Sequence, residues 1–307
     1  MPNLGNCDMR FQLIVMVIVV VASAVCTAQG DETSPGDEVK TLTVAVVSSH
    51  SDFCDVEANL KHFEVLIKEA AGKGARLVCF PELSLMAYST EKEILDVAEP
   101  IPGPSTEKLA AIAQSHNVYL SVGMAEKDGE KYHIAQAVIG PNGYLGKYRK
   151  CHPTGTEQNC GFSPGKEFPI FDIDGFCLGI NICADGRQED TIQAMKDAKV
   201  DMIHHPHGNY LSLGKDAEEW TRGKMVYFVP RATFSRSYIL INNSAGDTRH
   251  PRGVNEYGSG ALAIDPLGQV VDRTTQHDRK EKMIVVEITR PLSALVPPFE
   301  MRRMHRK

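Results

Sequence analysis

"TLTVAVVSSHSDFCDVEANLKHFEVLIKEAAGKGARLVCF", residues 41–80, contains a strand, a helix and a second strand in succession. The first nine residues are rich in β-branched side chains, which is typical of a short buried strand. Residues 55–75 then place apolar side chains at helical spacing, and the GKG at 72–74 supplies a helix stop. RLVCF at 76–80 is again short and apolar. This order predicts a layered α/β fold.

The same alternation continues along the chain. Ser105 is the predicted N-cap of the second helix. The other predicted helices and strands alternate over 105–117, 118–126, about 187–198, 200–206, 216–234, 237–245 and 282–289. Antiparallel strands are predicted at a hairpin with a PNG turn, at a strand pair around Asp174 and Gly175, and at a hairpin with a PLG turn, over 135–150, 168–183 and 259–274. We therefore expect mixed sheets.

The N-terminus predicts a targeting segment. An uncharged run of apolar and small residues begins at Phe11, after Arg10, and small residues continue to Ala28. Because a membrane span needs about 20 apolar residues, we interpret residues 1–28 as a signal peptide of an exported protein, periplasmic or secreted. Retention as an N-terminal membrane anchor is the second interpretation. Lipid attachment at Cys26 is the third, since Val25 fits poorly before a lipidated cysteine.

The rest of the chain is predicted to form one domain. Residues 29–41 are polar and rich in Gly, Pro and acidic side chains, as in a linker. Residues 42–298 suit one large α/β domain, and residues 299–307 form a basic tail. A net charge of −6 argues against nucleic-acid binding. Eight cysteines are too few for a disulfide-dense scaffold, and the spacing of Cys151 and Cys160 leaves open whether they form a disulfide.

Three reactive side chains stand at the ends of apolar strand-like runs, where ligands approach an open α/β sheet. Glu82 follows a strand and a proline, so its carboxylate can be held in a dry place with a raised pKa. Lys150 supplies a compact cation for a developing oxyanion. Cys183, in INICADGR (180–187), supplies a nucleophile if a neighbouring base favours its thiolate. Taken alone, Cys183 is more simply a small buried hydrophobe.

FPEL (80–83), GKYRKCH (146–152) and NICAD (181–185), in this order, resemble the carbon-nitrogen hydrolase (nitrilase) superfamily, amidase-like branch. The resemblance covers nearly the whole chain from Leu42. It implies a four-layered α-β-β-α sandwich of mixed sheets. It also implies that Glu82 is the general base, Lys150 the cation of the transition state and Cys183 the nucleophile. Glu157, seven residues after Lys150, matches a second glutamate that orients the lysine and the substrate.

The implied activity is that of a thiol amidohydrolase. Such an enzyme hydrolyses a small amide or N-carbamoyl compound through a cysteine thioester and releases ammonia or an amine, without a metal or an organic cofactor. The resemblance also implies a homo-oligomer. Candidate substrate contacts are Tyr88, Ala184 through its backbone N–H, Asp185, His207 and Asn209.

Three other functions share parts of this pattern. Nitrile hydrolysis on the same triad is disfavoured, because nitrilases favour Trp-Glu where this chain has Ala184 and Asp185. A lipoprotein acyltransferase would need several membrane spans, and a silent binding protein would not need the triad. A zinc site at His204, His205 and His207 is also disfavoured, because alternate residues of a strand point to opposite faces.

Overall fold

The computed structural model describes residues 38–210, 216–247 and 256–290. The predicted signal peptide, most of the predicted linker and the basic tail lie outside these ranges. The first strand begins at Lys40, two residues before the predicted start of the domain at Leu42. None of the helices in the described ranges has the length and apolarity that a membrane span requires.

The first sheet contains six strands in the order β12-β1-β2-β3-β4-β5. Their bounds are β1 (Lys40–Ser48), β2 (Leu77–Cys79), β3 (Tyr119–Asp128), β4 (Lys131–Gly140), β5 (Gly143–Arg149) and β12 (Lys282–Arg290). The strands β1, β2 and β3 are parallel, while β4, β5 and β12 pair antiparallel. Two helices, α1 (Val56–Gly72) and α2 (Pro104–His116), and the short η1 (Lys92–Leu95) belong to this half.

The second sheet also contains six strands, in the order β11-β10-β9-β8-β7-β6. Their bounds are β6 (Phe171–Ile173), β7 (Phe176–Ile180), β8 (Met202–His207), β9 (Tyr238–Asn243), β10 (Ala261–Ile264) and β11 (Val270–Arg273). The strands β7, β8 and β9 are parallel, and the outer strands are antiparallel. The helices of this half are α4 (Glu189–Asp197) and α5 (Ala217–Ser235).

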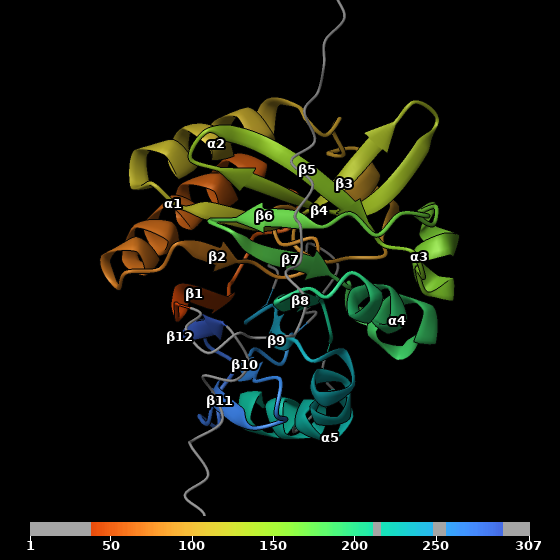
Figure 1. The fold of residues 1–307 in the computed structure, drawn as a ribbon. Helices are drawn as coiled ribbons and strands as arrows, with labels where there is room; N and C mark the ends of the chain where they lie inside the picture. The colour runs from red at the N-terminus through yellow and green to blue at the C-terminus, as the bar shows by residue number, and fades with distance from the viewer. Residues whose placement is uncertain (1–37, 211–215, 248–255, 291–307) are drawn as a thin grey trace, which may run out of the picture.

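The two sheets pack face to face between two pairs of helices. In Figure 1, α1 and α2 lie on one side of the molecule and α5 lies on the opposite side. A second apolar cluster fills the space between the second sheet and its helices, with Ile203 and Ile241 from the sheet and Trp220 and Phe228 from α5. The predicted α/β fold with two mixed sheets in four layers is therefore confirmed.

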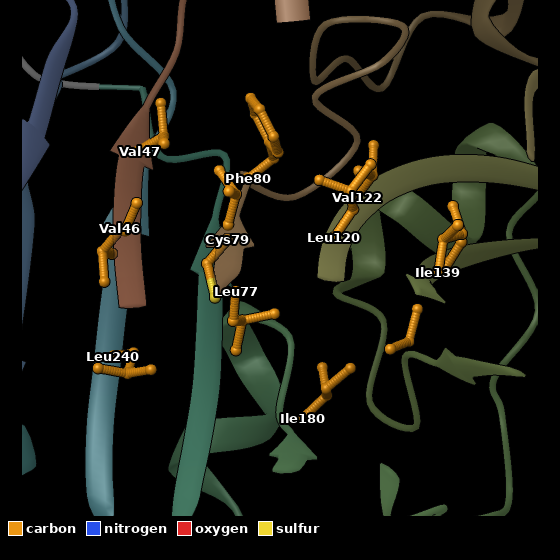
Figure 2. Packing of buried hydrophobic residues seen from close by; sticks show 14 of the residues in the cluster. Val46, Val47, Leu77, Cys79, Phe80, Leu120, Val122, Ile139, Ile180 and Leu240 are labelled. Atoms are coloured by element: carbon orange, nitrogen blue, oxygen red, sulfur yellow. The ribbon is translucent and has the colours of Figure 1, made fainter. Parts of the chain in front are cut away.

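The main core contains side chains from both sheets. Figure 2 shows Val46 and Leu77 from the first sheet and Ile180 and Leu240 from the second, all without exposed surface. One buried polar side chain in this core pairs across the two sheets. The Asn242 side-chain amide donates to the backbone oxygens of Val47 at 2.8 Å and Cys79 at 2.9 Å. These bonds fix the second sheet against the carboxyl ends of β1 and β2.

Several local predictions need correction. The helix α2 begins at Pro104 with Gly103 as its N-cap, because proline lacks the N–H that the first helical position leaves unpaired. The backbone N–H of Ser105, the predicted cap, donates instead to Glu99 Oε2 at 2.9 Å. Three short helices, η1, α3 (Gly155–Cys160) and η2 (Cys183–Arg187), lie where the sequence predicts none. Cys151 and Cys160 are free thiols in the structure.

Candidate active site

The predicted catalytic side chains come from both sheets. Glu82 follows β2 and Cys183 follows β7, so both lie beyond the carboxyl ends of parallel strands. Lys150 directly follows β5, and Asn209 follows β8. Because the two sheets face each other, the ends of these strands converge on one site, as expected of an open α/β sheet.

A buried lysine joins two buried glutamates at this site. Lys150 Nζ lies 2.6 Å from Glu82 Oε1 and 2.8 Å from Glu157 Oε1. The side chains of all three are at most 1% exposed. Removing three charged groups from water is costly unless each is paired, and here one cation serves two anions. The structure therefore brings Glu82, Lys150 and Glu157 into one charged cluster.

The two carboxylates are held by further hydrogen bonds. Glu157 Oε1 accepts from Tyr88 Oη at 2.7 Å, and Glu157 Oε2 accepts from the backbone N–H of Thr154 at 2.7 Å. Glu82 Oε2 accepts from the backbone N–H of Gly208 at 2.9 Å. Each oxygen of both carboxylates thus has a fixed donor, so Lys150 meets a preorganised pair of acceptors.

Backbone packing fixes the loop that carries Glu82. A Cβ on Gly123 of β3 would lie 2.3 Å from the backbone oxygen of Pro81 and 2.4 Å from the backbone nitrogen of Leu83. Only glycine permits this approach. The Gly123 carbonyl also accepts from the N–H of Leu85 at 2.9 Å. The position of the Glu82 backbone is therefore set by β3.

Cys183 is the first residue of η2 and lies in a strained turn that follows β7. Its φ is 46°, in the left-handed region that non-glycine residues rarely adopt. Asp185 holds this turn, because its carboxylate accepts from the N–H of Ile182 at 3.0 Å and from Tyr148 Oη at 2.7 Å. Its other oxygen accepts from the N–H of His152 at 2.7 Å. Such a turn presents the thiol outward at the sheet end, and its strain is maintained by the surrounding bonds.

The electrostatics of the site suit proton transfer from thiol to carboxylate. Burial raises the pKa of Glu82 to about 7, although Lys150 opposes this shift. Burial and then the Glu82 charge raise the pKa of Cys183 to about 11. Burial lowers the pKa of Lys150, but the charges of Glu82, Cys183 and Glu157 outweigh it and raise that pKa overall. Near neutral pH, Cys183 is thus a thiol, Lys150 is charged and Glu82 can act as a base.

An acidic limb in the activity of the enzyme follows from the Glu82 pKa. A protonated Glu82 cannot accept the thiol proton, so kcat/KM on an uncharged amide should fall roughly tenfold per pH unit well below pH 7. Burial lowers the pKa of His204 to about 3, and those of His205 and His207 well below the usual value, so these groups stay neutral across this range. A pH–rate profile between pH 5 and 8 measures the limb, and a flat profile would contradict it.

Asn209 lies beside the thiol, and two residues of α5 contact Asn209. Asn209 Nδ2 lies 3.5 Å from Cys183 Sγ. Asn209 Oδ1 accepts from Lys224 Nζ at 3.0 Å and from Trp220 Nε1 at 3.4 Å. Lys224 and Trp220 are not predicted from the sequence, because no motif around them indicates an active site.

The other predicted binding residues differ in position. Tyr88 and Asp185 use their polar atoms on Glu157 and on the Cys183 turn, so both act as positioning residues. His207 is buried beneath α5, where its ring packs on Trp220 with centroids 5.5 Å apart. Ala184 lies in the first turn of η2, whose N–H groups have no helical acceptor. Its predicted role in binding the oxyanion stays a prediction.

The three histidines of β8 separate as strand alternation predicts. His204 Nδ1 lies 2.9 Å from Ser121 Oγ of the first sheet. His205 and His207 lie on the other face, with ring centroids 4.5 Å apart. The three rings therefore do not converge on one point.

Comparison with known proteins agrees with this geometry. The family model of carbon-nitrogen hydrolases matches residues 43–297. The chain belongs to this family. It is 36% identical over 252 residues to a nitrilase of Pyrococcus abyssi, covering 80% of this chain and 89% of that protein. It is 34% identical over 223 residues to the omega-amidase NIT2-B of Xenopus laevis, covering 69% and 77% respectively.

Solved structures share the fold of this carbon-nitrogen hydrolase. An amidase from Nesterenkonia sp. superposes with a TM-score of 0.68 at 17% identity, covering 83% of this chain and 94% of that one. A glutamine-dependent NAD+ synthetase from Acinetobacter baumannii gives a TM-score of 0.68 at 18% identity, covering 81% and 45%. The α/β sandwich is thus common to amidases of the nitrilase superfamily and to part of a larger enzyme.

Proposed function

We propose that this carbon-nitrogen hydrolase is a thiol amidohydrolase that cleaves a small amide or N-carbamoyl compound. The observation that carries the proposal is the buried Lys150 between Glu82 and Glu157, next to the strained turn of Cys183. This arrangement provides a base, a cation and a nucleophile, which are the three groups that acyl transfer needs.

The first half of the reaction forms a thioester. Glu82 takes the thiol proton while Sγ of Cys183 attacks the carbonyl carbon, and the carbonyl π electrons move to the oxygen. Lys150 stabilises the oxyanion that forms, together with a backbone N–H, for which we propose Ala184. The oxyanion then collapses, the C–N bond breaks, and the proton on Glu82 passes to the nitrogen, which leaves as ammonia or an amine.

The second half hydrolyses the thioester. Glu82 is again a carboxylate, so it removes a proton from water as the water oxygen attacks the same carbon. Collapse of the second oxyanion breaks the C–S bond and releases a carboxylic acid or a carbamic acid. The proton on Glu82 returns to the sulfur. One base therefore serves both halves, and water is the one reactant besides the substrate that the proposed reaction consumes.

Nitrile hydrolysis is the second candidate function. The name of the Pyrococcus abyssi relative favours it. Against it stands the Ala184-Asp185 pair after the nucleophile, where nitrilases favour Trp-Glu. In favour of amides stands the name of the Xenopus laevis relative.

A substrate panel tests the proposal. Purified protein is incubated with aliphatic amides, N-carbamoyl amino acids and the matching nitriles, and the release of ammonia and acid is measured. We expect turnover of at least one amide or carbamoyl compound at a kcat/KM at least tenfold above that of its nitrile. Turnover of nitriles alone would select the second candidate, and turnover of neither class would overturn the proposal.

Assembly and export are proposals as well. We propose a homo-oligomer, which the exposed apolar side chains Val226, Tyr227 and Phe234 on α5 support. Light scattering in solution measures its mass, and a monomer would contradict it.

We also propose export through residues 1–28, which N-terminal sequencing of the mature protein checks.

A further inference from the structure

Lys224 is a cation at the active site that the proposed reaction does not use. It lies on α5, and its Nζ is 3.0 Å from Asn209 Oδ1 and 3.4 Å from His207 Nδ1. It also lies 5.1 Å from the centre of the Trp220 ring. The amide and the indole carry no charge, and burial keeps His207 neutral by lowering its pKa. The groups that contact Lys224 directly are thus neutral, and burial lowers its pKa to about 8, so Lys224 is still mostly charged at pH 7.5.

Lys224 determines the orientation of the Asn209 amide. Lysine can only donate hydrogen bonds, and so can the indole N–H. Because Lys224 Nζ and Trp220 Nε1 both point at one end of the amide, that end must be the oxygen. The amide NH2 is then forced to the other end, where Nδ2 lies 3.5 Å from Cys183 Sγ.

The backbone of Asn209 is fixed separately. Its N–H donates to Asn243 Oδ1 at 2.7 Å, and its carbonyl accepts from Asn243 Nδ2 at 3.1 Å. Asn243 is the last residue of β9, so the second sheet itself carries this bidentate contact. With the backbone held, the side-chain amide can face the sulfur with either its oxygen or its NH2 group. Lys224 determines that the NH2 group faces the sulfur.

The charge of Lys224 also acts on the nucleophile. It lowers the pKa of Cys183, in the same direction as Lys150 and against the larger effects of burial and Glu82. The thiolate that forms during attack would therefore lie between Lys150, bound to Glu82 and Glu157, and the pair of Lys224 from α5 and Asn209 after β8. An amide N–H on a sulfur is a stronger bond when the sulfur is charged.

We propose that Lys224 is a positioning residue that acts on Cys183 through Asn209. Its ammonium holds the amide oxygen, turns the amide N–H groups toward Sγ and so favours the thiolate. The inference rests on Cys183 as the nucleophile of the proposed function. It adds a second lysine, which lies on α5 beside the second sheet, to the residues that prepare the thiol for attack.

The rate of Cys183 alkylation tests this role without any substrate. Full-length protein is treated with iodoacetamide at pH 7.5, and modification of the Cys183 peptide is followed by mass spectrometry. Since alkylation follows the thiolate fraction, the loss of one favourable charge in Lys224→Met should slow it about tenfold, equivalent to a shift of about one pKa unit. Lys224→Arg keeps the charge and a donor, and should restore the rate to within about threefold of wild type.

A double-mutant cycle separates this mechanism from a general change in the site. If Lys224 acts through Asn209, the tenfold effect of Lys224→Met should shrink to less than about threefold in the Asn209→Ala background, where only the direct effect of its charge on the sulfur remains. Arg222→Met is the matched control, because it removes from the same helix a cation that is 65% exposed and that, within the described part of the chain, pairs with Glu218. It should react as the wild type does.

Three outcomes would overturn the inference: a Lys224→Met rate within twofold of wild type, additive effects in the cycle, or an equal loss in Lys224→Arg. Lys224→Gln, which keeps an N–H donor without the charge, replaces Lys224→Met if methionine unfolds α5, as judged by circular dichroism, and is expected to slow alkylation between twofold and tenfold. Lack of amide turnover together with a slowed Lys224→Met alkylation would refute the proposed function alone.

Discussion

Replacing Cys183 by alanine should abolish turnover of the best amide of the panel, with kcat lowered at least about 10⁴-fold. The reason is that no other group at the site can form the acyl intermediate, since Glu82 and Lys150 are bound to each other at 2.6 Å. Stability should change little, by less than about 1 kcal/mol, because a small half-buried side chain is shortened by one atom. Steady-state kinetics and thermal unfolding measure the two effects.

Cys54→Ala is the matched control for this variant. Burial raises the pKa of Cys54 to about 11, as it does for Cys183. The Cys54 thiol, however, donates to the carbonyl of Glu93, and the charge of Asp96 raises its pKa without an opposing lysine among the described residues. Full activity in Cys54→Ala and none in Cys183→Ala would show that neighbours, rather than thiol acidity, make a nucleophile. Ammonia release that survives Cys183→Ala would rule out the thioester mechanism.

The proximity of Glu82, Lys150 and Cys183 could be predicted because each follows an apolar strand-like run, and the end of a strand is a predictable place. The sequence also contains a pattern that indicates the position of Glu157. Thr154 and Glu157 form a capping box, T-x-x-E, in which each side chain bonds the other residue's backbone N–H. This pattern indicates the start of α3, which was not predicted from the sequence because the helix has only six residues. A capping box so close to Lys150 would have located both the helix and the orientation of its glutamate.

Lys224 could not be predicted from the sequence, and the reason lies in α5. This helix exposes Val226, which is 80% exposed, and Phe234, while it turns Thr221 and Lys224 toward the second sheet. Because α5 also buries Trp220 and Phe228, both of its faces mix apolar and polar residues, and the usual amphipathic pattern is lost. Periodicity therefore gives no sign that Lys224 faces the site. Its contact with Asn209 depends on how β8 and α5 meet.

The same limit applies to Asp185. Its position after Cys183 predicts a substrate contact, but its carboxylate is occupied by donors from Tyr148 and His152, more than thirty residues earlier. No local pattern shows these contacts. Whether a polar residue next to a nucleophile binds substrate or holds the turn is therefore decided by long-range contacts.

Replacing Lys150 by methionine should damage both catalysis and folding. The variant leaves Glu82 and Glu157 buried side by side without their cation, and breaking a buried ion pair costs about 3–5 kcal/mol of unfolding free energy. Without the cation for the oxyanion, kcat should also fall at least about 10³-fold. Urea unfolding and steady-state kinetics measure the losses.

The pH dependence of the stability loss identifies its cause. Without Lys150, burial and repulsion from Glu157 raise the folded-state pKa of Glu82 further above that of the unfolded chain. Groups with raised pKa values stabilise the fold at low pH, and this contribution is lost as pH rises through the folded-state values. Lys150→Met should therefore be closer to wild type in stability at pH 5.5 than at pH 8.

An exposed pair provides the control for this variant. Lys73 Nζ lies 2.7 Å from Glu69 Oε1, nearly the distance in the buried cluster, but these side chains are 47% and 51% exposed. Lys73→Met should change stability by less than about 1 kcal/mol, with little dependence on pH. If Lys150→Met behaves like Lys73→Met, the carboxylates do not depend on the lysine. A loss near 4 kcal/mol at pH 8 that shrinks at pH 5.5 assigns the energy of this site to burial, because the two ion pairs differ in exposure far more than in distance.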